Sequence, residues 1–142
     1  MSTQKTYFQD EDFFDELPAS GYYPGYITDA RFRRSANGNR MLQVLVELEG
    51  VGPAHQLVAD YFVLDGERAS PTGIFLARRR LLQMYRACGI FPKQGQEIVP
   101  AKLLQARLQV RIEHEQWKGQ PRLRVAGYRP LASVDPYDPI PF

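Results

Sequence analysis

The chain has little of the chemistry on which most catalytic and metal sites depend. Its 142 residues include one cysteine, Cys88, and two histidines, His55 and His114, and none of the three stands at the spacing of metal ligands. The sequence has no Gly-Lys-Ser/Thr phosphate loop and no serine in the setting of a nucleophile elbow. We therefore expect a protein that is not an enzyme and that uses neither a cofactor nor a metal.

Disulfides and long apolar runs are missing as well. A single cysteine excludes an intramolecular disulfide and favours a reducing compartment. The longest apolar runs have four residues, such as Ile74–Ala77, which is far short of a membrane span. The acidic N-terminus lacks the basic and apolar regions of a secretory signal. These absences predict a cytoplasmic protein without a membrane-spanning segment.

Charge, in contrast, is plentiful and unevenly distributed. The chain carries 18 basic and 16 acidic side chains. Residues 1–20 hold one lysine against five carboxylates, and residues 133–142 hold two aspartates. Residues 21–132 therefore hold 17 basic and 9 acidic side chains, a net charge of +8. A basic body between acidic ends is typical of a protein that binds polyanions, although an ordinary basic surface is the alternative.

One helix is expected, over residues 70–89. Ser70 suits its N-cap, Pro71 its first turn and Gly89 its C-terminal stop. Cys88 falls on the apolar face of this helix, so we expect it in the core and not as a nucleophile. Arg78–Arg80 fan over the remaining surface, and we expect them to be solvated or bound to the acidic tail, away from any nucleic-acid site.

Alternating apolar and polar residues predict five strands around this helix. They cover residues 22–34, 40–48, 55–64, 106–116 and 121–129. Asn37-Gly38 marks the first hairpin, and Trp117–Gln120 are expected to form the loop of the last one.

The order of these elements sets the fold class. A helix between the third and fourth of five strands predicts a mainly β protein, a five-stranded OB-fold barrel with the helix plugging one end. An open α+β sheet with one covering helix is the alternative. We expect an acidic N-terminal arm over residues 1–20, a nucleic-acid-binding domain over 21–132, and a disordered acidic interaction tail over 133–142.

Cations and aromatic rings gather around the predicted sheet. Binding of a single strand without reading its sequence needs both, the cations for phosphates and the rings for bases. For Phe32 and Tyr61 a core position is equally open, because the bend expected in the first strand leaves its facing undecided. The residues expected to bind DNA are Tyr26, Arg31, Phe32, Arg33, Arg34, Arg40, Tyr61, Trp117, Lys118, Arg122 and Arg124.

The last residues form a second candidate binding element. Prolines hold this segment extended, its apolar side chains suit a pocket, and its aspartates suit a basic rim. We expect it to bind a protein partner through Asp135, Asp138, Ile140, Pro141 and Phe142.

These features together resemble one family. Residues 138–142, Asp-Pro-Ile-Pro-Phe, are similar to the end of the acidic tail of bacterial single-stranded DNA-binding proteins. The body resembles the phage and mobile-element members of that family over residues 21–27, 37–44 and 88–90. The resemblance implies an OB-fold protein of the bacterial cytoplasm or nucleoid. It also implies that the body coats and protects single-stranded DNA while the tail recruits replication, recombination and repair proteins.

Two other functions stay open at this point. One is an RNA-binding OB module, and the other is an adaptor that binds protein and no nucleic acid. The oligomeric state is likewise left open.

Overall fold

The structure, a computed structural model, describes residues 5–9 and 16–131. The tail residues 133–142 and much of the N-terminal arm thus lie outside the described residues. The described part of the chain contains β1 (Gly21–Arg34), β2 (Arg40–Leu48), β3 (Leu57–Asp65), α1 (Pro71–Ala87), β4 (Arg107–Trp117) and β5 (Gln120–Arg129). The prediction of a mainly β protein with its helix between the third and fourth strands is confirmed, and the predicted bounds lie within two residues of those observed.

Two local predictions need correction. His55 was expected to open the third strand, but it lies in the 3-10 helix η2 (Pro53–His55). Pro53 fixes its own φ near the helical value and favours such a turn. The segment after α1, where no further helix was expected, contains a second 3-10 helix, η3 (Pro100–Leu103).

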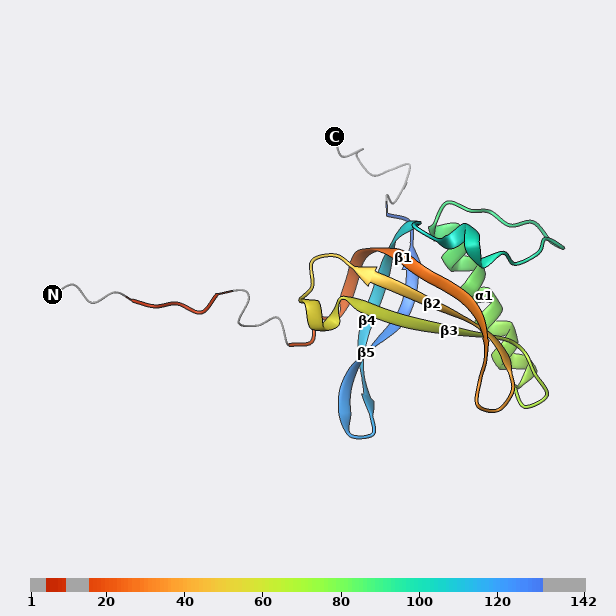
Figure 1. Cartoon of the computed structure of the whole chain (residues 1–142), viewed down its shortest axis with the longest axis horizontal. Helices are drawn as coiled ribbons and strands as arrows, with labels where there is room; N and C mark the ends of the chain where they lie inside the picture. The colour runs from red at the N-terminus through yellow and green to blue at the C-terminus, as the bar shows by residue number, and fades with distance from the viewer. Residues whose placement is uncertain (1–4, 10–15, 132–142) are drawn as a thin grey trace.

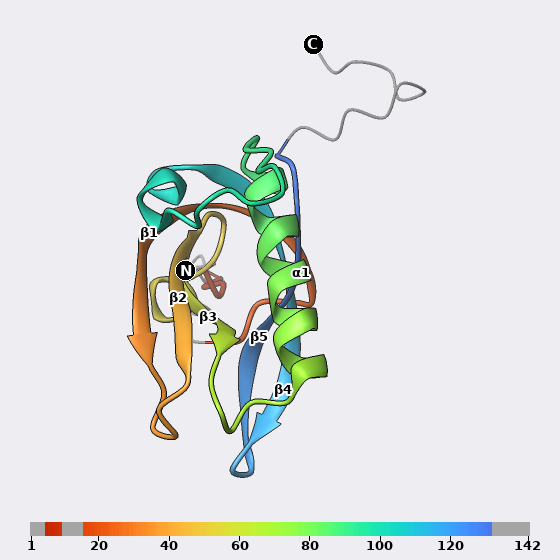
Figure 2. The ribbon, with the colours of Figure 1, turned by 90° about the vertical axis from the view of Figure 1, so that its right-hand side faces the viewer.

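The five strands form one open antiparallel sheet in the order β3-β2-β1-β4-β5 (Figure 1). β1 is its central strand, since residues 21–26 pair with β4 and residues 25–34 pair with β2. β3 and β5 are the two edges, and the sheet curves enough to bring them near each other. Helix α1 packs against both edge strands and runs alongside β5 (Figure 2).

The core lies on the inner face of this curved sheet. Alternate residues of each long strand point into it, as the sequence pattern predicts. The helix adds one side of its surface, and the phenol of Tyr85 donates a hydrogen bond to the Val99 carbonyl at 3.0 Å. The fully buried positions include Ile27, Leu42, Val44, Val46, Leu48, Phe62, Met84, Leu103, Leu108, Val110 and Ile112.

Both ends of α1 are capped as predicted. The Ser70 hydroxyl oxygen accepts a hydrogen bond from the Gly73 amide at 3.0 Å, which satisfies one of the free amides of the first turn. Gly89 has a φ of +80°, in the left-handed region that ends many helices. Cys88, before it, is half-buried against the core. Burial raises the pKa of its thiol to about 11, which keeps the sulfur protonated near neutral pH.

A buried polar cluster joins α1 to the two edge strands. Asp60 of β3 is only 9% exposed, and it accepts a hydrogen bond from the Tyr128 phenol at 2.6 Å and forms an ion pair with Arg80. The Arg80 guanidinium also lies 4.8 Å from the centre of the Phe62 ring. A buried carboxylate needs such partners, because leaving it unpaired is costly.

This cluster corrects one expectation about the helix arginines. Arg80 pairs with Asp60, and Arg78 donates two hydrogen bonds to the Leu64 carbonyl at 3.2 and 3.3 Å. Both side chains therefore fasten α1 to β3 and are not simply solvated. Arg79 lies against the exposed Phe75 of its own helix, with its guanidinium 5.7 Å from the ring centre.

Replacement of Tyr128 by Phe tests the cluster. Burial first, and then the neighbouring Asp60, raise the pKa of the Tyr128 phenol well above its usual value. We expect Tyr128→Phe to lower the free energy of unfolding by about 1–2 kcal/mol at pH 7, because Asp60 loses a buried donor. A phenol with a raised pKa stabilises the fold below its unfolded pKa of about 10 and loses this effect as the pH rises further. The difference in the free energy of unfolding between wild type and variant should therefore decrease above about pH 10.

Urea unfolding at pH 7 and pH 11 measures both effects. The exposed Tyr61→Phe is the matched control and should change stability by less than about 0.5 kcal/mol. Equal losses in the free energy of unfolding in Tyr128→Phe and Tyr61→Phe would contradict a stabilising role for the cluster.

Candidate nucleic-acid interface

A β-bulge in β1 decides which side chains face outward. The register between β1 and β2 shifts between Ile27 and Asp29, so the strand has one extra residue there. Before the bulge the inward residues are odd-numbered, and Ile27 is fully buried. After the bulge the parity reverses, and Phe32 pairs with the inward Leu42. The two halves of β1 therefore present different sets of side chains to each face.

The bulge separates two aromatic residues that were predicted to act together. Tyr61 of β3 pairs with Gln43 and faces outward, whereas Phe32 lies on the inner side near the turn of the first hairpin. Phe32 is 39% exposed, and the Arg40 guanidinium covers its ring at 4.5 Å from the centre. Arg34 pairs with Arg40 across the hairpin and donates to the Gly38 carbonyl at 3.1 Å. Phe32, Arg34 and Arg40 thus form a group apart from Tyr61.

A polar row crosses the outward face of the first three strands. Arg33 donates to the Gln43 side-chain oxygen at 2.7 Å, and Gln43 donates to the Tyr61 hydroxyl at 3.3 Å. Arg31, two residues earlier on β1, forms an ion pair with Asp29 at 2.5 Å. The row ends on Tyr61, which is 47% exposed and so offers a ring to a ligand.

Tyr26 also faces outward, but it is engaged within the sheet. Its hydroxyl donates a short hydrogen bond to the Glu47 carboxylate on β2. That bond is the first cause of the raised pKa of the phenol, followed by desolvation and the charges of Glu47 and Glu49. Stacking of a base on Tyr26 would place its phosphate near these carboxylates, so Tyr26 is the weakest of the predicted residues as a nucleic-acid contact.

The last hairpin carries an exposed tryptophan beside two cations. Trp117 ends β4 and is 51% exposed. The turn that follows has two residues, Lys118 and Gly119, both with positive φ, as in a type I′ turn. The Arg122 guanidinium lies 4.1 Å and the Lys118 ammonium 5.5 Å from the centre of the indole ring. The tight turn thus brings two positive charges to one aromatic ring, within the range of a cation–π interaction.

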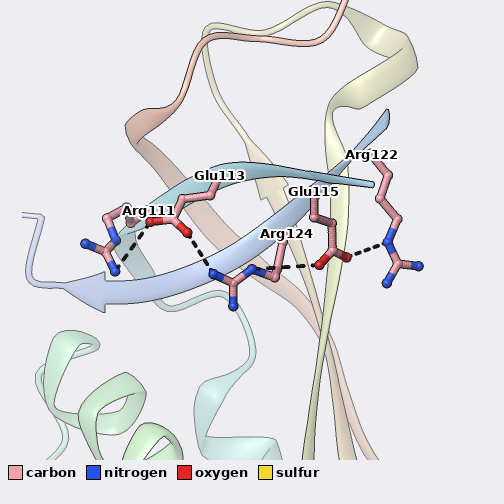
Figure 3. A network of polar contacts seen from close by, with 5 residues as sticks. All are labelled: Arg111, Glu113, Glu115, Arg122 and Arg124. Atoms are coloured by element: carbon pink, nitrogen blue, oxygen red, sulfur yellow. Dashed lines mark hydrogen bonds and ion pairs between the residues drawn. The ribbon is translucent and has the colours of Figure 1, made fainter. Parts of the chain in front are cut away.

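A chain of ion pairs runs along the outward face of this hairpin (Figure 3). Arg122 binds Glu115 at 2.5 Å, Arg124 binds Glu113 at 2.7 Å and Glu115 at 3.8 Å, and Arg111 binds Glu113 at 3.7 Å. Three arginines share two glutamates, so the network carries a net charge of +1. The arginine side chains are about half exposed, and exposed ion pairs of this kind contribute little to stability. The arginines can therefore exchange carboxylates for other anions at small cost.

One groove collects residues from both halves of the sheet. It has a volume of about 570 Å³ and lies between β3 and β5, the two edge strands. Leu57 and Tyr61 line one wall, and Arg122 and Arg124 line the other. Leu17, at the root of the N-terminal arm, also lines it. The structure thus brings three of the predicted residues, Tyr61, Arg122 and Arg124, to one concave surface, with Trp117 stacked beside Arg122.

The sequence interpretation missed several outward cations. Tyr22 of β1 stacks under Arg129, whose guanidinium is 3.6 Å from the ring centre, and it pairs with Arg111 of β4. Arg107 binds Glu49 at 2.6 Å. The sequence pattern of β4 could have identified Arg107 and Arg111 as outward cations, because Arg107, Gln109 and Arg111 alternate with buried residues.

A second basic groove lies on the helix side of the molecule. It has a volume of about 810 Å³ and is lined by α1 and the end of β5. Arg79, Arg86 and Arg129 line it, together with the exposed Phe91. This groove contains none of the eleven residues predicted to bind DNA, and it is the natural place for control substitutions.

The predicted partner-binding residues Asp135, Asp138, Ile140, Pro141 and Phe142 lie outside the described residues. Within residues 5–9 and 16–131, no group of three His, Cys, Asp or Glu side chains could hold a metal ion. Over the same residues, no helix has the length and apolar character needed to cross a membrane.

No protein-family model matches the chain, and a comparison with curated proteins finds no relative.

The fluorescence of Trp117, the chain's single tryptophan, reports the local charge. Iodide is attracted by the two neighbouring cations, whereas neutral acrylamide is not. We expect Arg122→Ala to lower the iodide quenching constant by roughly 1.5- to 2-fold, because one charge near the ring is removed. Acrylamide quenching should change less.

The matched control is Arg34→Ala, at the other hairpin, which should leave both quenching constants unchanged. An equal loss of iodide quenching in the two variants would mean that Arg122 does not set the potential at the ring.

Proposed function

We propose that this protein binds single-stranded DNA without strong sequence preference, along the groove between β3 and β5 and the outward face of the last hairpin. One observation carries the proposal: Tyr61, Arg122 and Arg124 line a single groove, and Trp117 stacks on Arg122 at its rim. Exposed rings beside exchangeable cations are the two features that sequence-tolerant binding of a single strand requires.

We further infer that the sheet is an OB-fold. Three features support this: β1 is shared between β2 and β4, α1 lies between β3 and β4 in the chain, and α1 packs on both edge strands. OB-folds bind oligomers across the face of their second and third strands and the loops beside it. The polar row that ends on Tyr61 occupies that face here.

The chemistry of the site favours an unpaired strand. Tyr61 and Trp117 offer ring faces, and a duplex hides the faces of its bases within the stack. Phosphates would take the place of Glu113 and Glu115 as partners of Arg122 and Arg124. Such an exchange releases counterions from the nucleic acid, so binding should weaken as salt increases.

Titration with oligo-dT tests this proposal. We expect quenching of Trp117 fluorescence and salt-sensitive binding. The double variant Arg122→Ala/Arg124→Ala should bind roughly tenfold more weakly. The slope of its log affinity against log salt concentration should fall by an amount equivalent to about one to two phosphate contacts. The matched control is Arg79→Ala/Arg86→Ala in the helix-side groove, which should bind like wild type.

Several outcomes would contradict the proposal. Equal losses in the two double variants would place the site on the helix side. Tighter binding of a matched RNA oligomer would favour the RNA-binding alternative, since the 2′-OH distinguishes the two. Absence of oligonucleotide binding at low salt, where the electrostatic attraction is strongest, would favour the protein adaptor.

We also propose that the C-terminal residues recruit DNA-processing proteins. The support is the sequence pattern of Asp135, Asp138 and the apolar Ile140–Phe142, and its resemblance to the tails of bacterial single-stranded DNA-binding proteins. A segment of this kind binds as an extended peptide, with rings in a pocket and carboxylates on a basic rim.

Deletion of residues 140–142 separates the two activities. We expect the shortened protein to bind oligo-dT within about twofold of wild type, because none of the groove residues is removed. A pull-down of replication and repair proteins from a bacterial extract should lose the partners that the full chain captures. A loss of oligo-dT binding in this truncation would show that the tail has a different role.

A further inference from the structure

A second exposed ring lies on the outward face of the sheet, at the far end of the row of ion pairs. Tyr22 of β1 pairs with Arg111 of β4, and both lie on that face. The Arg129 guanidinium lies 3.6 Å from the centre of the Tyr22 ring, and Tyr22 is 39% exposed. Arg129 also donates a hydrogen bond to the neutral Gln109 side chain, and it forms no ion pair with any described residue. Tyr22 and Arg129 thus form an aromatic and cationic pair like the one at the hairpin end.

A β-bulge in β5 places Arg129 on this face. The register between β4 and β5 shifts after Arg111, and Ala126 is the extra residue of β5. Without this residue, the alternation that points Arg124 outward would also point Tyr128 outward. With it, Tyr128 enters the core and Arg129 is exposed. The bulge therefore aligns Arg129 with the arginines of the last hairpin.

Arg111 fills the interval between the two ends of this face. It pairs with Gly127 of β5, and a Cβ atom added at Gly127 would lie 3.8 Å from the Arg111 Nε. The Arg111 side chain thus lies over the bare backbone of Gly127. Figure 3 shows Arg111, Arg124 and Arg122 in one row along the hairpin, with glutamates between them. Cations therefore lie along the whole face from Arg122 to Tyr22.

These residues form what we call the outward track: Trp117, Arg122, Arg124, Arg111, Arg129 and Tyr22. A ring lies at each end, and among the described residues only Glu113 and Glu115 form ion pairs with the four arginines. Trp117 and Arg111, the partner of Tyr22, are six residues apart on β4. This separation corresponds to about 20 Å along the strand. A stacked strand of DNA rises about 3.4 Å per nucleotide, so the track has the length of roughly six nucleotides.

Carboxylates mark the end of the track beyond Tyr22. Four residues further along β1, Tyr26 donates a hydrogen bond to the Glu47 carboxylate. Arg107, which pairs with Tyr26 from β4, is bound to Glu49 at 2.6 Å. A phosphate at this point would be repelled by two carboxylates. The favourable surface therefore runs from the hairpin end to Tyr22 and stops there.

We propose that the outward track is a second binding segment for single-stranded DNA, continuous with the groove, and that Tyr22 and Arg129 form a stacking platform for a base at its far end. The inference rests on the proposed function, and it adds a second platform and a length to it. A base can stack on the guanidinium plane of Arg129 or replace it over the ring. A phosphate at Arg129 displaces no carboxylate, in contrast to one at Arg122 or Arg124. A strand that reaches both ends makes contacts that a shorter strand cannot make.

The dependence of binding on oligomer length tests the proposal in the full-length protein. The probes are dT4, which is too short for the track, and dT12, which exceeds it. Wild type should bind dT12 at least tenfold more tightly than dT4 at low salt. Tyr22→Leu keeps an apolar side chain but removes the ring, and it should weaken dT12 binding roughly fivefold. Its effect on dT4 should be less than about twofold, because Tyr61 and Trp117 hold a short strand at the groove end.

The salt dependence separates the ring from the charge. Arg129→Gln should weaken dT12 binding and lower the slope of log affinity against log salt concentration by about one phosphate contact. Tyr22→Leu should leave that slope unchanged, because it removes no charge. A merely structural role for either residue would weaken dT4 and dT12 binding equally, and that result would overturn the proposal.

Helix α1 offers a matched control pair of an exposed ring and an arginine. The Arg79 guanidinium lies 5.7 Å from the centre of the Phe75 ring, away from the track. Phe75→Leu and Arg79→Gln should bind both oligomers like wild type. Equal losses of dT12 binding in these controls and in the track variants would overturn the proposal.

Two further outcomes separate this proposal from the proposed function. If Arg122→Ala/Arg124→Ala weakens dT12 binding but Tyr22→Leu and Arg129→Gln do not, the proposed function stands and the second platform is refuted. If wild type fails to bind dT12 at low salt, the proposed function is refuted and the platform with it.

Photocrosslinking supplies a measurement that does not depend on affinity. Irradiation of wild type with a twelve-nucleotide strand of 5-iodouracil should attach DNA to both Trp117 and Tyr22. A four-nucleotide strand should attach mainly to Trp117. Crosslinks of the longer strand to Phe75 or Phe91 in place of Tyr22 would overturn the proposal.

Discussion

The arrangement of the sheet depends on how closely β2 approaches β1 at Gly25, where β1 also pairs with β4. This residue pairs with Leu48 of β2 and with Leu108 of β4, so it lies where both neighbours contact the central strand. A Cβ atom at Gly25 would lie 2.8 Å from the Glu47 carbonyl oxygen and 3.1 Å from a Val46 methyl. Only glycine permits this approach. β1 pairs with β4 through its first half and with β2 mainly through its second half, and the sheet curves enough to bring β3 and β5 near each other.

The two edge strands lie close together, and the groove lies between them. Asp60 of β3, Tyr128 of β5 and Arg80 of α1 are joined through a buried carboxylate. Asp60 also lines the groove, together with the next residue, Tyr61, and with Arg124 of β5. The cluster that fastens the edge strands to α1 therefore lies directly beside the groove.

The arginines of the last hairpin are paired with glutamates in ion pairs that are easily broken. Arg122 and Arg124 are paired with glutamates, which prevents strong self-repulsion in a hairpin rich in arginine. The pairs are exposed and weak, so a polyanion with a denser charge can replace them.

Much of the secondary structure was determined by the sequence alone. Period-two alternation located the five strands, and Ser70, Pro71 and Gly89 located the helix, because these signals act within a few residues. The apolar face of the helix likewise identified Cys88 as a residue that packs on the core. The sequence also located the last hairpin and Trp117 at its end. The expected loop Trp117–Gln120 is shorter in the structure, because Trp117 belongs to β4 and Gln120 to β5.

Only the tertiary structure decided which side chains act together. The bulge after Ile27 reversed the facing of β1 and separated Phe32 from Tyr61, and a single added residue of this kind leaves no clear mark in the sequence. Asp60 required Arg80 and Tyr128 because burial removed its water, and burial depends on the whole fold. Tyr61 and Arg124 lie 63 residues apart, and curvature of the sheet alone brings them to one groove. Local patterns record what a residue does for its own strand or helix, whereas a binding site depends on which strands become neighbours.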